Sequence, residues 1–309
     1  MSAALRGFEP HPQAAVPLGL LREIGDLKRI RSAGRRGSVA TRLFREAWSA
    51  LAAGDDAASL AWSVTARALA AARLGDLDRE ALRALGLSAD EAAEILGRGL
   101  REAGTALPAG TLDRLAAALS GNRRREGPEP PAFVAALEQQ PRAGITCPGR
   151  PRIMLQPAES HAEHCLAVAV YGVLLAGPYG ADPAAVFLAG LAHHLHNAAM
   201  PDSGFTGEML LGTHLLPAMQ RATEQALAQL DQGLRREVER ACRILPDAGT
   251  PDGRAFHAAD VLDRVLEIEQ HLVPARLTMA EVLGPMALVH DGPVKPFHDA
   301  VLAAHGLLP

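Results

Sequence analysis

Apolar residues recur at helical spacing along most of this chain. From about Leu18 to Leu119 the helical pattern is interrupted only by short breaks such as "AAGDD" and "RLGDLD", and no convincing alternation of period two indicates a strand. In "LSADEAAEIL", Ser88 followed three residues later by Glu91 forms a capping-box pattern, which predicts the start of a helix. We therefore predict an all-α fold.

The pattern changes between about residues 120 and 160. Prolines interrupt it repeatedly, and they break helices because they lack an amide hydrogen. They are Pro128, Pro130, Pro131, Pro141, Pro148, Pro151 and Pro157. We interpret residues 121–160 as a Pro-rich linker with one short helix around "AFVAALEQQ". The predicted organisation is a separate N-terminal helical region of unknown role, residues 1–120, and a C-terminal helical bundle, residues 161–309.

Helical periodicity resumes at about His161. The apolar run from Cys165 to Gly177 is too short to span a bilayer, which needs about 20 residues. It predicts a buried helix instead. Asp182 followed by Pro183 is a typical helix start, because the carboxylate caps free amides and proline suits the first helical position.

Three further helices are expected in the second half. One covers "FTGEMLLGTHLLPAM" or its first half. The next spans about Ala222–Ile244, and the last spans Arg254–Leu272.

Composition narrows the class of protein. Aromatic residues make up only 4% of the 309 residues while 48% are hydrophobic, so the core is built from Ala, Leu and Val. A formal net charge of -4 argues against a nucleic-acid-binding protein. Cys147, Cys165 and Cys242 lie far apart without C-x-x-C spacing, which argues against a disulfide framework and fits a reducing cytoplasm. The first residues have no apolar segment of a signal peptide.

A basic stretch lies in the N-terminal region. Its members are Lys28, Arg29, Arg31, Arg35, Arg36, Arg42 and Arg45. Such a stretch can receive phosphate or an acidic partner, but it is more often the solvated face of a helix, and this is our expectation.

Histidines are concentrated in the second half, where eight of the twelve lie between His161 and His271. Three segments supply imidazole or carboxylate at the edge of an apolar helix: "HAEHCLAVAV", "LAHHLHN" and "FHAADVLDRV". Together His164, His193, His194 and Asp260 make a four-ligand set for a divalent transition metal. Neutral imidazole and carboxylate suit Fe, Mn, Co, Ni and Zn.

The order of these segments resembles the HD-domain superfamily of metal-dependent phosphohydrolases over roughly Ser160–Leu272. His164 matches the first histidine of the family pattern, His193 the histidine of the His-Asp doublet, and Asp260 the last aspartate. The resemblance implies an HD-like helical domain with a metal centre formed by these residues.

The chain departs from the family pattern at His194, which occupies the position of the signature aspartate. An imidazole cannot bridge two metals as a carboxylate does with its two oxygens. A further histidine that binuclear members carry after the doublet is replaced by Gly207. One metal is therefore expected instead of two.

Helix geometry leaves the exact ligand set open. Residues three apart share a helix face, whereas adjacent residues lie about 100° apart. His196 therefore shares a face with His193 and is a further candidate ligand. His257 and Asp260 are also three apart, so His257 is either a ligand or an orienting partner of Asp260.

The resemblance implies a hydrolase with a mononuclear site that acts on a phosphate ester or a phosphorylated small molecule. Asp263 or Glu163 is the candidate catalytic base, and Arg221 or Arg264 is the candidate partner for the anion. Two alternatives stay open: an iron-dependent oxygenase of HD type, and an HD-like scaffold that has lost its metal and binds a partner. The expected partner is an anionic small molecule, without nucleic acid or membrane, and the chain can form a homodimer.

Overall fold

The computed structural model describes residues 16–121, 129–149, 151–246 and 248–272, together with positions 278 and 280. The chain divides into two compact units, Met1–Leu266 and Glu267–Pro309. Most of the second unit, and with it the end of the predicted domain 161–309, lies outside the described residues. All-α is confirmed for the described residues, whose only extended pairings are isolated bridges.

The helices that precede residue 122 follow one another with short connections, and η marks a short 3₁₀ helix. They are α1 (Leu18–Gly25), η1 (Asp26–Lys28), α2 (Val39–Ala52), α3 (Ala57–Leu74), α4 (Arg79–Ala84), α5 (Ala89–Ala103) and α6 (Ala109–Gly121). The predicted capping box is present at the start of α5, where Ser88 and Glu91 bond reciprocally to each other's backbone amides.

The helices after residue 128 carry the predicted histidine segments. They are α7 (Ala132–Gln139), α8 (His161–Tyr179), α9 (Pro183–Ala192), η2 (Leu195–Ala198), α10 (Gly204–Leu211), η3 (Gly212–His214), α11 (Leu215–Leu227), α12 (Gln232–Ala241), η4 (Cys242–Ile244) and α13 (Pro251–Leu272). Asp182 caps α9 and Pro183 is its first residue, as predicted.

One expected helix is wrong in its extent. The segment predicted as one helix over Ala222–Ile244 is broken between α11 and α12. Asp231 has extended backbone angles and accepts hydrogen bonds from the amides of Gly233 and Leu234, so it starts a new helix. Local capping by an aspartate therefore outweighs the continuous helical periodicity of the sequence.

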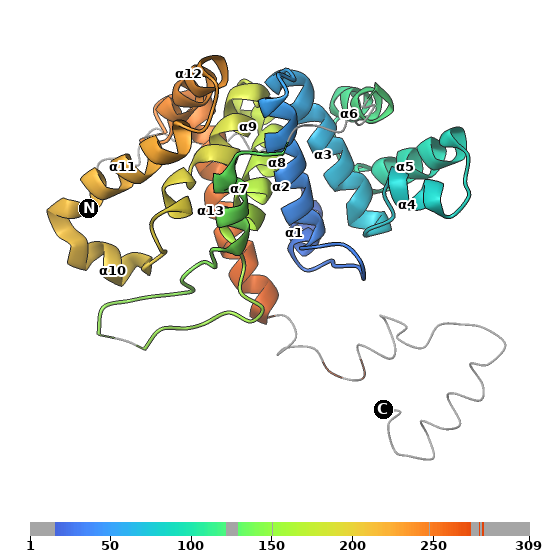
Figure 1. Ribbon diagram of the computed structural model, residues 1–309. Helices are drawn as coiled ribbons and strands as arrows, with labels where there is room; N and C mark the ends of the chain where they lie inside the picture. The colour runs from blue at the N-terminus through green and yellow to red at the C-terminus, as the bar shows by residue number, and fades with distance from the viewer. Residues whose placement is uncertain are drawn as a thin grey trace. The chain divides into compact units, whose positions relative to one another are not determined.

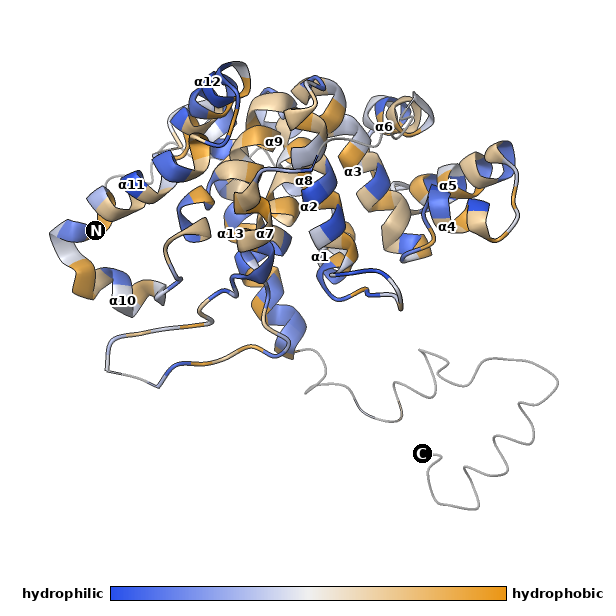
Figure 2. Cartoon of the chain, in the orientation of Figure 1, coloured by the Kyte–Doolittle hydropathy of each residue, from blue (hydrophilic) through white to orange (hydrophobic). Residues whose placement is uncertain are grey.

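Helices α8 and α9 form the centre of the first unit. They pack along each other, with α2 and α3 on one side and α12 on the other (Figure 1). In Figure 2, α9 is mainly hydrophobic, whereas α12 is largely hydrophilic. By length and composition α8 is able to cross a membrane, but 83% of its apolar window is buried inside the protein, as expected for a core helix.

Close contact between α8 and α9 depends on glycine. A Cβ on Gly190 of α9 would lie 2.6 Å from the Cα of Ala169 on α8. A Cβ on Gly172 of α8 would lie 2.4 Å from a side-chain carbon of Val186 on α9. Both distances are shorter than any carbon contact. At Gly190 the neighbouring atom belongs to the backbone and cannot rotate away, so glycine is required there, whereas at Gly172 the side chain of Val186 would have to shift. The approach places the N-terminal turn of α8 beside the C-terminal end of α9.

The predicted separation of residues 1–120 from the histidine-bearing helices is not confirmed. Helices α2 and α3 contact α8 and α9 directly, and their apolar residues belong to one continuous core. The predicted short helix in the Pro-rich segment is present as α7. Its Phe133 is buried against Trp48 of α2, with ring centroids 4.8 Å apart, so this part of the segment joins the same core.

Candidate metal centre

The start of α8 is fixed by its own sequence. Ser160 caps the helix by accepting a hydrogen bond from the amide of Glu163, and the Glu163 carboxylate accepts one from the amide of Ser160. This capping box sets the first helical residue at His161. His164 follows one turn later and is fully buried.

The end of α9 presents the histidine doublet. α9 ends at Ala192, His193 has helical backbone angles after it, and His194 leaves the α-helical conformation with φ -111° and ψ 21°. η2 then begins at Leu195. This change of backbone direction allows two adjacent side chains to approach one centre, although on a regular helix they would lie about 100° apart.

The structure brings three of the five predicted ligands, His164, His193 and Asp260, within 4.0 Å of one another, and it places His194 beside the two histidines. The Nε2 atoms of His164 and His193 are 3.1 Å apart, and Oδ1 of Asp260 lies 3.3 Å from the first and 4.0 Å from the second. One ligand atom each from His164, His193 and His194 lies within 4.8 Å of the others.

Each of these imidazoles has its Nδ1 occupied by an acceptor. The Nδ1 of His164 is 2.7 Å from Oδ2 of Asp263, and that of His193 is 2.7 Å from the carbonyl oxygen of Gly190. Neither partner has a proton to give, since Asp263 already accepts from Lys28 at both oxygens. Both Nδ1 atoms are therefore the protonated nitrogens.

The third imidazole follows the same rule. The Nδ1 of His194 is 2.9 Å from Oδ1 of Asn197. The amide nitrogen of Asn197 donates to the carbonyl oxygen of Met200, which identifies its oxygen as the atom facing His194. The Nδ1 of His194 therefore donates as well, and its Nε2 carries the lone pair.

Burial keeps these histidines neutral. It lowers the pKa of His164 to about 4, and it lowers the pKa values of His193 and His194 well below their usual range. The carboxylate of Asp260 is partly accessible, with 22% of its side chain exposed, and it lies 4.0 Å from the guanidinium group of Arg264. An ionised carboxylate thus faces neutral imidazoles.

These protonation states leave lone pairs facing one another. With both Nδ1 atoms protonated, the 3.1 Å contact between the Nε2 atoms of His164 and His193 contains no proton, and Asp260 adds a negative oxygen. Such an arrangement is repulsive unless a cation lies between the atoms. At metal–ligand distances of about 2.1 Å, neighbouring ligand atoms lie roughly 3.0–3.4 Å apart. The contacts of His164 with His193 and Asp260, at 3.1 and 3.3 Å, match this range, whereas the 4.0 Å between His193 and Asp260 is wider.

His196, the fifth predicted ligand, lies beside this cluster. Its ring centroid is 5.5 Å from that of His194, and burial together with His161 lowers its pKa to about 4. His257 does not orient Asp260 through any contact found in the described residues. Its ring packs on Phe256, and its Nε2 has no hydrogen-bond partner there.

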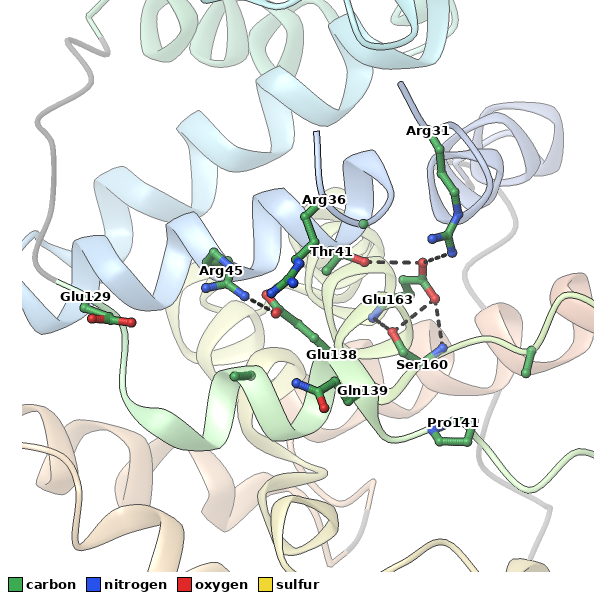
Figure 3. Close-up of a pocket in the computed structure, with 13 residues that line it drawn as sticks. Arg31, Arg36, Thr41, Arg45, Glu129, Glu138, Gln139, Pro141, Ser160 and Glu163 are labelled. Carbon is green, nitrogen blue, oxygen red and sulfur yellow. Dashed lines mark hydrogen bonds and ion pairs between the residues drawn. The ribbon is translucent and has the colours of Figure 1, made fainter. Parts of the chain in front are cut away.

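The two candidate bases occupy different surroundings. Asp263 is 1% exposed and bonded to His164 and Lys28, which suits an orienting role. The Glu163 carboxylate is held by Ser160 and accepts hydrogen bonds from Thr41 and Arg31 as well (Figure 3).

Glu163 and Ser160 also line a cavity of about 640 Å³ between the start of α2, α7 and the start of α8. Three arginines and three glutamates line it, so their formal charges balance: Arg31, Arg36, Arg45, Glu129, Glu138 and Glu163. None of the predicted metal ligands lines this cavity among the described residues. The cavity and the histidine cluster are therefore distinct features, although Glu163 and His164 are adjacent in sequence.

Sequence reasoning missed the residues that orient the cluster. Lys28 was expected on a solvated helix face, but it is 4% exposed and bonds to Glu159 and Asp263. Its contacts are 131 and 235 residues away in the chain, and no local pattern signals them. For Asn197 the sequence did give an indication: it lies three residues after His194, and side chains three residues apart meet on a helical turn.

Comparison with known proteins gave no relatives. No protein-family model matches this chain. No curated protein matches it by sequence, and no solved structure matches it.

Proposed function

We propose that this protein is a metal-dependent hydrolase with a mononuclear site that acts on a phosphate ester or a phosphorylated small molecule. His164, His193, His194 and Asp260 would hold the ion. The likeness of their order along the chain to the HD pattern gives the reaction class, and the arrangement of protons in the cluster supports the metal.

The observation that carries the proposal is the convergence of lone pairs without protons between them. A buried group of neutral imidazoles and a carboxylate is destabilising by itself when its lone pairs face no donor. Each unsatisfied buried polar group costs about 1–3 kcal/mol. Three separate acceptors fix the three Nδ1–H groups: a carboxylate, a backbone carbonyl and a side-chain amide. Fixing the second ring nitrogen in this way is typical of metal-ligating histidines.

Two features favour one metal over two. His194 supplies nitrogen instead of a bridging carboxylate. The other cluster of potential ligands, Glu159, His164 and Asp263, already has the ammonium group of Lys28 in hydrogen-bond contact with its two carboxylates. The ammonium group of Lys28 thus offsets the negative charge of this second cluster, where a second metal would otherwise bind.

Access to the site favours an anionic substrate. Asp260 is partly exposed, with 22% of its side chain accessible, and Arg264 lies 4.0 Å from it with 60% accessible. A substrate would enter on this side, and Arg264 would bind its anionic group. Arg221, the other candidate, is exposed on α11 without an observed contact to the cluster in the described part of the chain.

In the proposed reaction the chain mainly positions the metal ligands and the anionic group of the substrate. A bound divalent metal supplies Lewis acidity and a nucleophilic water at neutral pH. The protein residues keep the imidazoles neutral and oriented, and Arg264 holds the anion. Asp263 is assigned an orienting role here, since both of its oxygens are already occupied, and Glu163 is assigned to helix capping.

Metal analysis tests the proposal. Protein purified without added metal, and then equilibrated with Mn, Fe, Co, Ni or Zn and desalted, is expected to retain about one ion per chain, the stoichiometry of a single closed ligand set. His193→Ala is expected to lose it. His214→Ala is the matched control, because His214 is an exposed histidine of η3. Retention of the ion by His193→Ala, or its absence from the natural protein with every metal, would refute the site.

Activity is tested separately, with bis(p-nitrophenyl) phosphate and p-nitrophenyl phosphate as probes of diesterase and monoesterase chemistry. Turnover that requires metal and disappears in His193→Ala supports the hydrolase. Full occupancy by metal without turnover of any phosphate ester would leave the metal site standing and reject this reaction.

A second function has one observation in its favour. His164, His193 and Asp260 are two histidines and one carboxylate, the set typical of non-haem iron(II) oxygenases. Oxygen consumption by the iron(II)-loaded protein, measured with an oxygen electrode and absent with zinc, would favour this alternative. A metal-free scaffold is the third: in that case only His194→Asp, which restores a carboxylate, would bind metal.

A further inference from the structure

Lys28 is a buried lysine with an unusual set of partners. It ends η1 and is 4% exposed. Its Nζ donates to Oδ1 and Oδ2 of Asp263 at 2.7 and 2.9 Å and also to Oε1 of Glu159. An ammonium group has three hydrogens and no acceptor capacity, so every one of these contacts is a donation by Lys28.

The carboxylate of Asp263 accepts hydrogen bonds at both of its oxygens. Its Oδ2 receives both Lys28 and the Nδ1–H of His164, at 2.9 and 2.7 Å. Because Lys28 can only donate, whatever group stands at position 263 must turn an acceptor towards it. The ammonium group of Lys28 therefore attracts an oxygen of residue 263, and the other side-chain atom of residue 263 faces His164.

The tautomer of His164 follows from this arrangement. With a carboxylate at position 263, both oxygens accept, so His164 donates from Nδ1 and keeps its lone pair on Nε2, 3.1 Å from the Nε2 of His193. With the opposite tautomer, a hydrogen would occupy Nε2 and exclude a metal from that atom.

We propose that Lys28 is a positioning residue of the metal centre: by donating to both oxygens of Asp263 it fixes the carboxylate that accepts the Nδ1–H of His164, and so it keeps Nε2 of His164 directed towards the metal. The proposal rests on the proposed function for its metal, but not for its proton arrangement. It gives the N-terminal part of the chain a role, since η1 supplies an outer contact of a centre whose ligands lie on α8, α9 and α13.

Replacing Asp263 by asparagine tests the proposal sharply. Asp263→Asn is nearly isosteric, and Lys28 must attract its single remaining oxygen. The amide NH₂ then faces His164 and donates to Nδ1, which moves the hydrogen of His164 to Nε2. The readout is the ¹H–¹⁵N NMR spectrum of the ¹⁵N-histidine-labelled metal-free protein, with the His164 signals identified by His164→Gln.

The natural protein is expected to show His164 with a protonated Nδ1, and Asp263→Asn is expected to show it with a protonated Nε2. An unchanged tautomer in Asp263→Asn would overturn the proposal, because it would mean that Lys28 does not fix the orientation of residue 263. This result does not depend on metal binding, and so it stays decisive if the natural protein takes up no metal. That latter outcome would refute the proposed function alone.

A second pair of variants removes Lys28 itself. Lys28→Met/Glu159→Gln deletes one positive and one negative charge, which leaves the net charge of the buried cluster unchanged, and Glu159→Gln alone is the matched control. We expect the Co²⁺ dissociation constant, followed by visible absorption, to rise about 10- to 100-fold in the double variant, the usual effect of losing an outer-shell partner. Glu159→Gln should stay within about threefold of the natural protein, below that range.

Equal Co²⁺ affinity in the double variant and in Glu159→Gln would contradict the proposal. If the double variant fails to fold, as judged by circular dichroism, the isosteric Asp263→Asn still decides the question through the tautomer of His164.

Discussion

Gly190 connects the packing of two helices to the orientation of a ligand. A Cβ placed on it would lie 2.6 Å from Cα, 2.7 Å from N and 3.0 Å from Cβ of Ala169. The first two atoms belong to the backbone of α8, so no side-chain rotation relieves the contact. The carbonyl oxygen of the same residue accepts the Nδ1–H of His193.

We predict that Gly190→Ala destabilises the protein. Carbon atoms pack at about 3.5–4.0 Å, so the two helices must separate by roughly 1 Å. Overpacking of this kind costs about 1–3 kcal/mol. Alanine in place of glycine in a helix returns about 0.5–1 kcal/mol, so the expected net loss is about 0.5–2 kcal/mol.

Urea unfolding of the metal-free protein, followed by circular dichroism, measures the loss as a change in the free energy of unfolding. Gly110→Ala on α6 is the matched control: its Cβ would meet nothing within 4 Å, and Gly110 lies in the first turn of the helix, so the change should not destabilise the protein and should stabilise it by less than about 1 kcal/mol. Gly190→Ala should also weaken Co²⁺ binding, because its carbonyl moves relative to His193. If Gly190→Ala is as stable as the natural protein, the close approach of α8 and α9 described above is incorrect.

Three other predictions concern capping, pH and ligand orientation. Ser160→Ala should lower the free energy of unfolding by about 1 kcal/mol, since it removes the N-cap of α8; urea unfolding measures this. Burial acts to raise the pKa of Asp78, but its hydrogen bond from Arg35 outweighs burial and lowers the pKa on balance. The folded state thus favours ionised Asp78, so Asp78→Asn, which keeps the cap, should cost about 0.5–1 kcal/mol at pH 7. This difference should shrink as the pH falls below about 4, the usual pKa of aspartate, and a constant difference would contradict the ion pair. Asn197→Ala should raise the Co²⁺ dissociation constant about tenfold in a titration, because the Nδ1–H of His194 loses its acceptor.

The sequence was informative wherever a signal is local. The capping box at Ser88 and the Asp182–Pro183 helix start were recognisable from a few adjacent residues, and both are present. The apolar run within α8 correctly indicated a buried helix. The break at Asp231 has a local signal too, but the continuous apolar periodicity around it concealed the cap.

The sequence predicted the candidate centre only in part. His164, His193 and Asp260 were grouped because their order resembles a known pattern, and the structure places them within 4.0 Å of one another. The roles of the residues around them could not be predicted from the sequence. Whether Asp263 orients a ring or takes up a proton depends on Lys28, which is 235 residues away, and spacing along a chain carries no information about such a contact.

The long sequence separation between Lys28 and Asp263 has a consequence for how the protein is made. During synthesis the chain emerges from its N-terminus, and domains fold as units in that order. Lys28 emerges first, its carboxylate partner on α13 only after more than two hundred further residues. A nascent or truncated chain that stops before α13 therefore has two of the imidazole segments but neither Asp260 nor Asp263. Metal uptake at the proposed site would report that synthesis has passed α13, not merely that the histidines of α8 and α9 have been made.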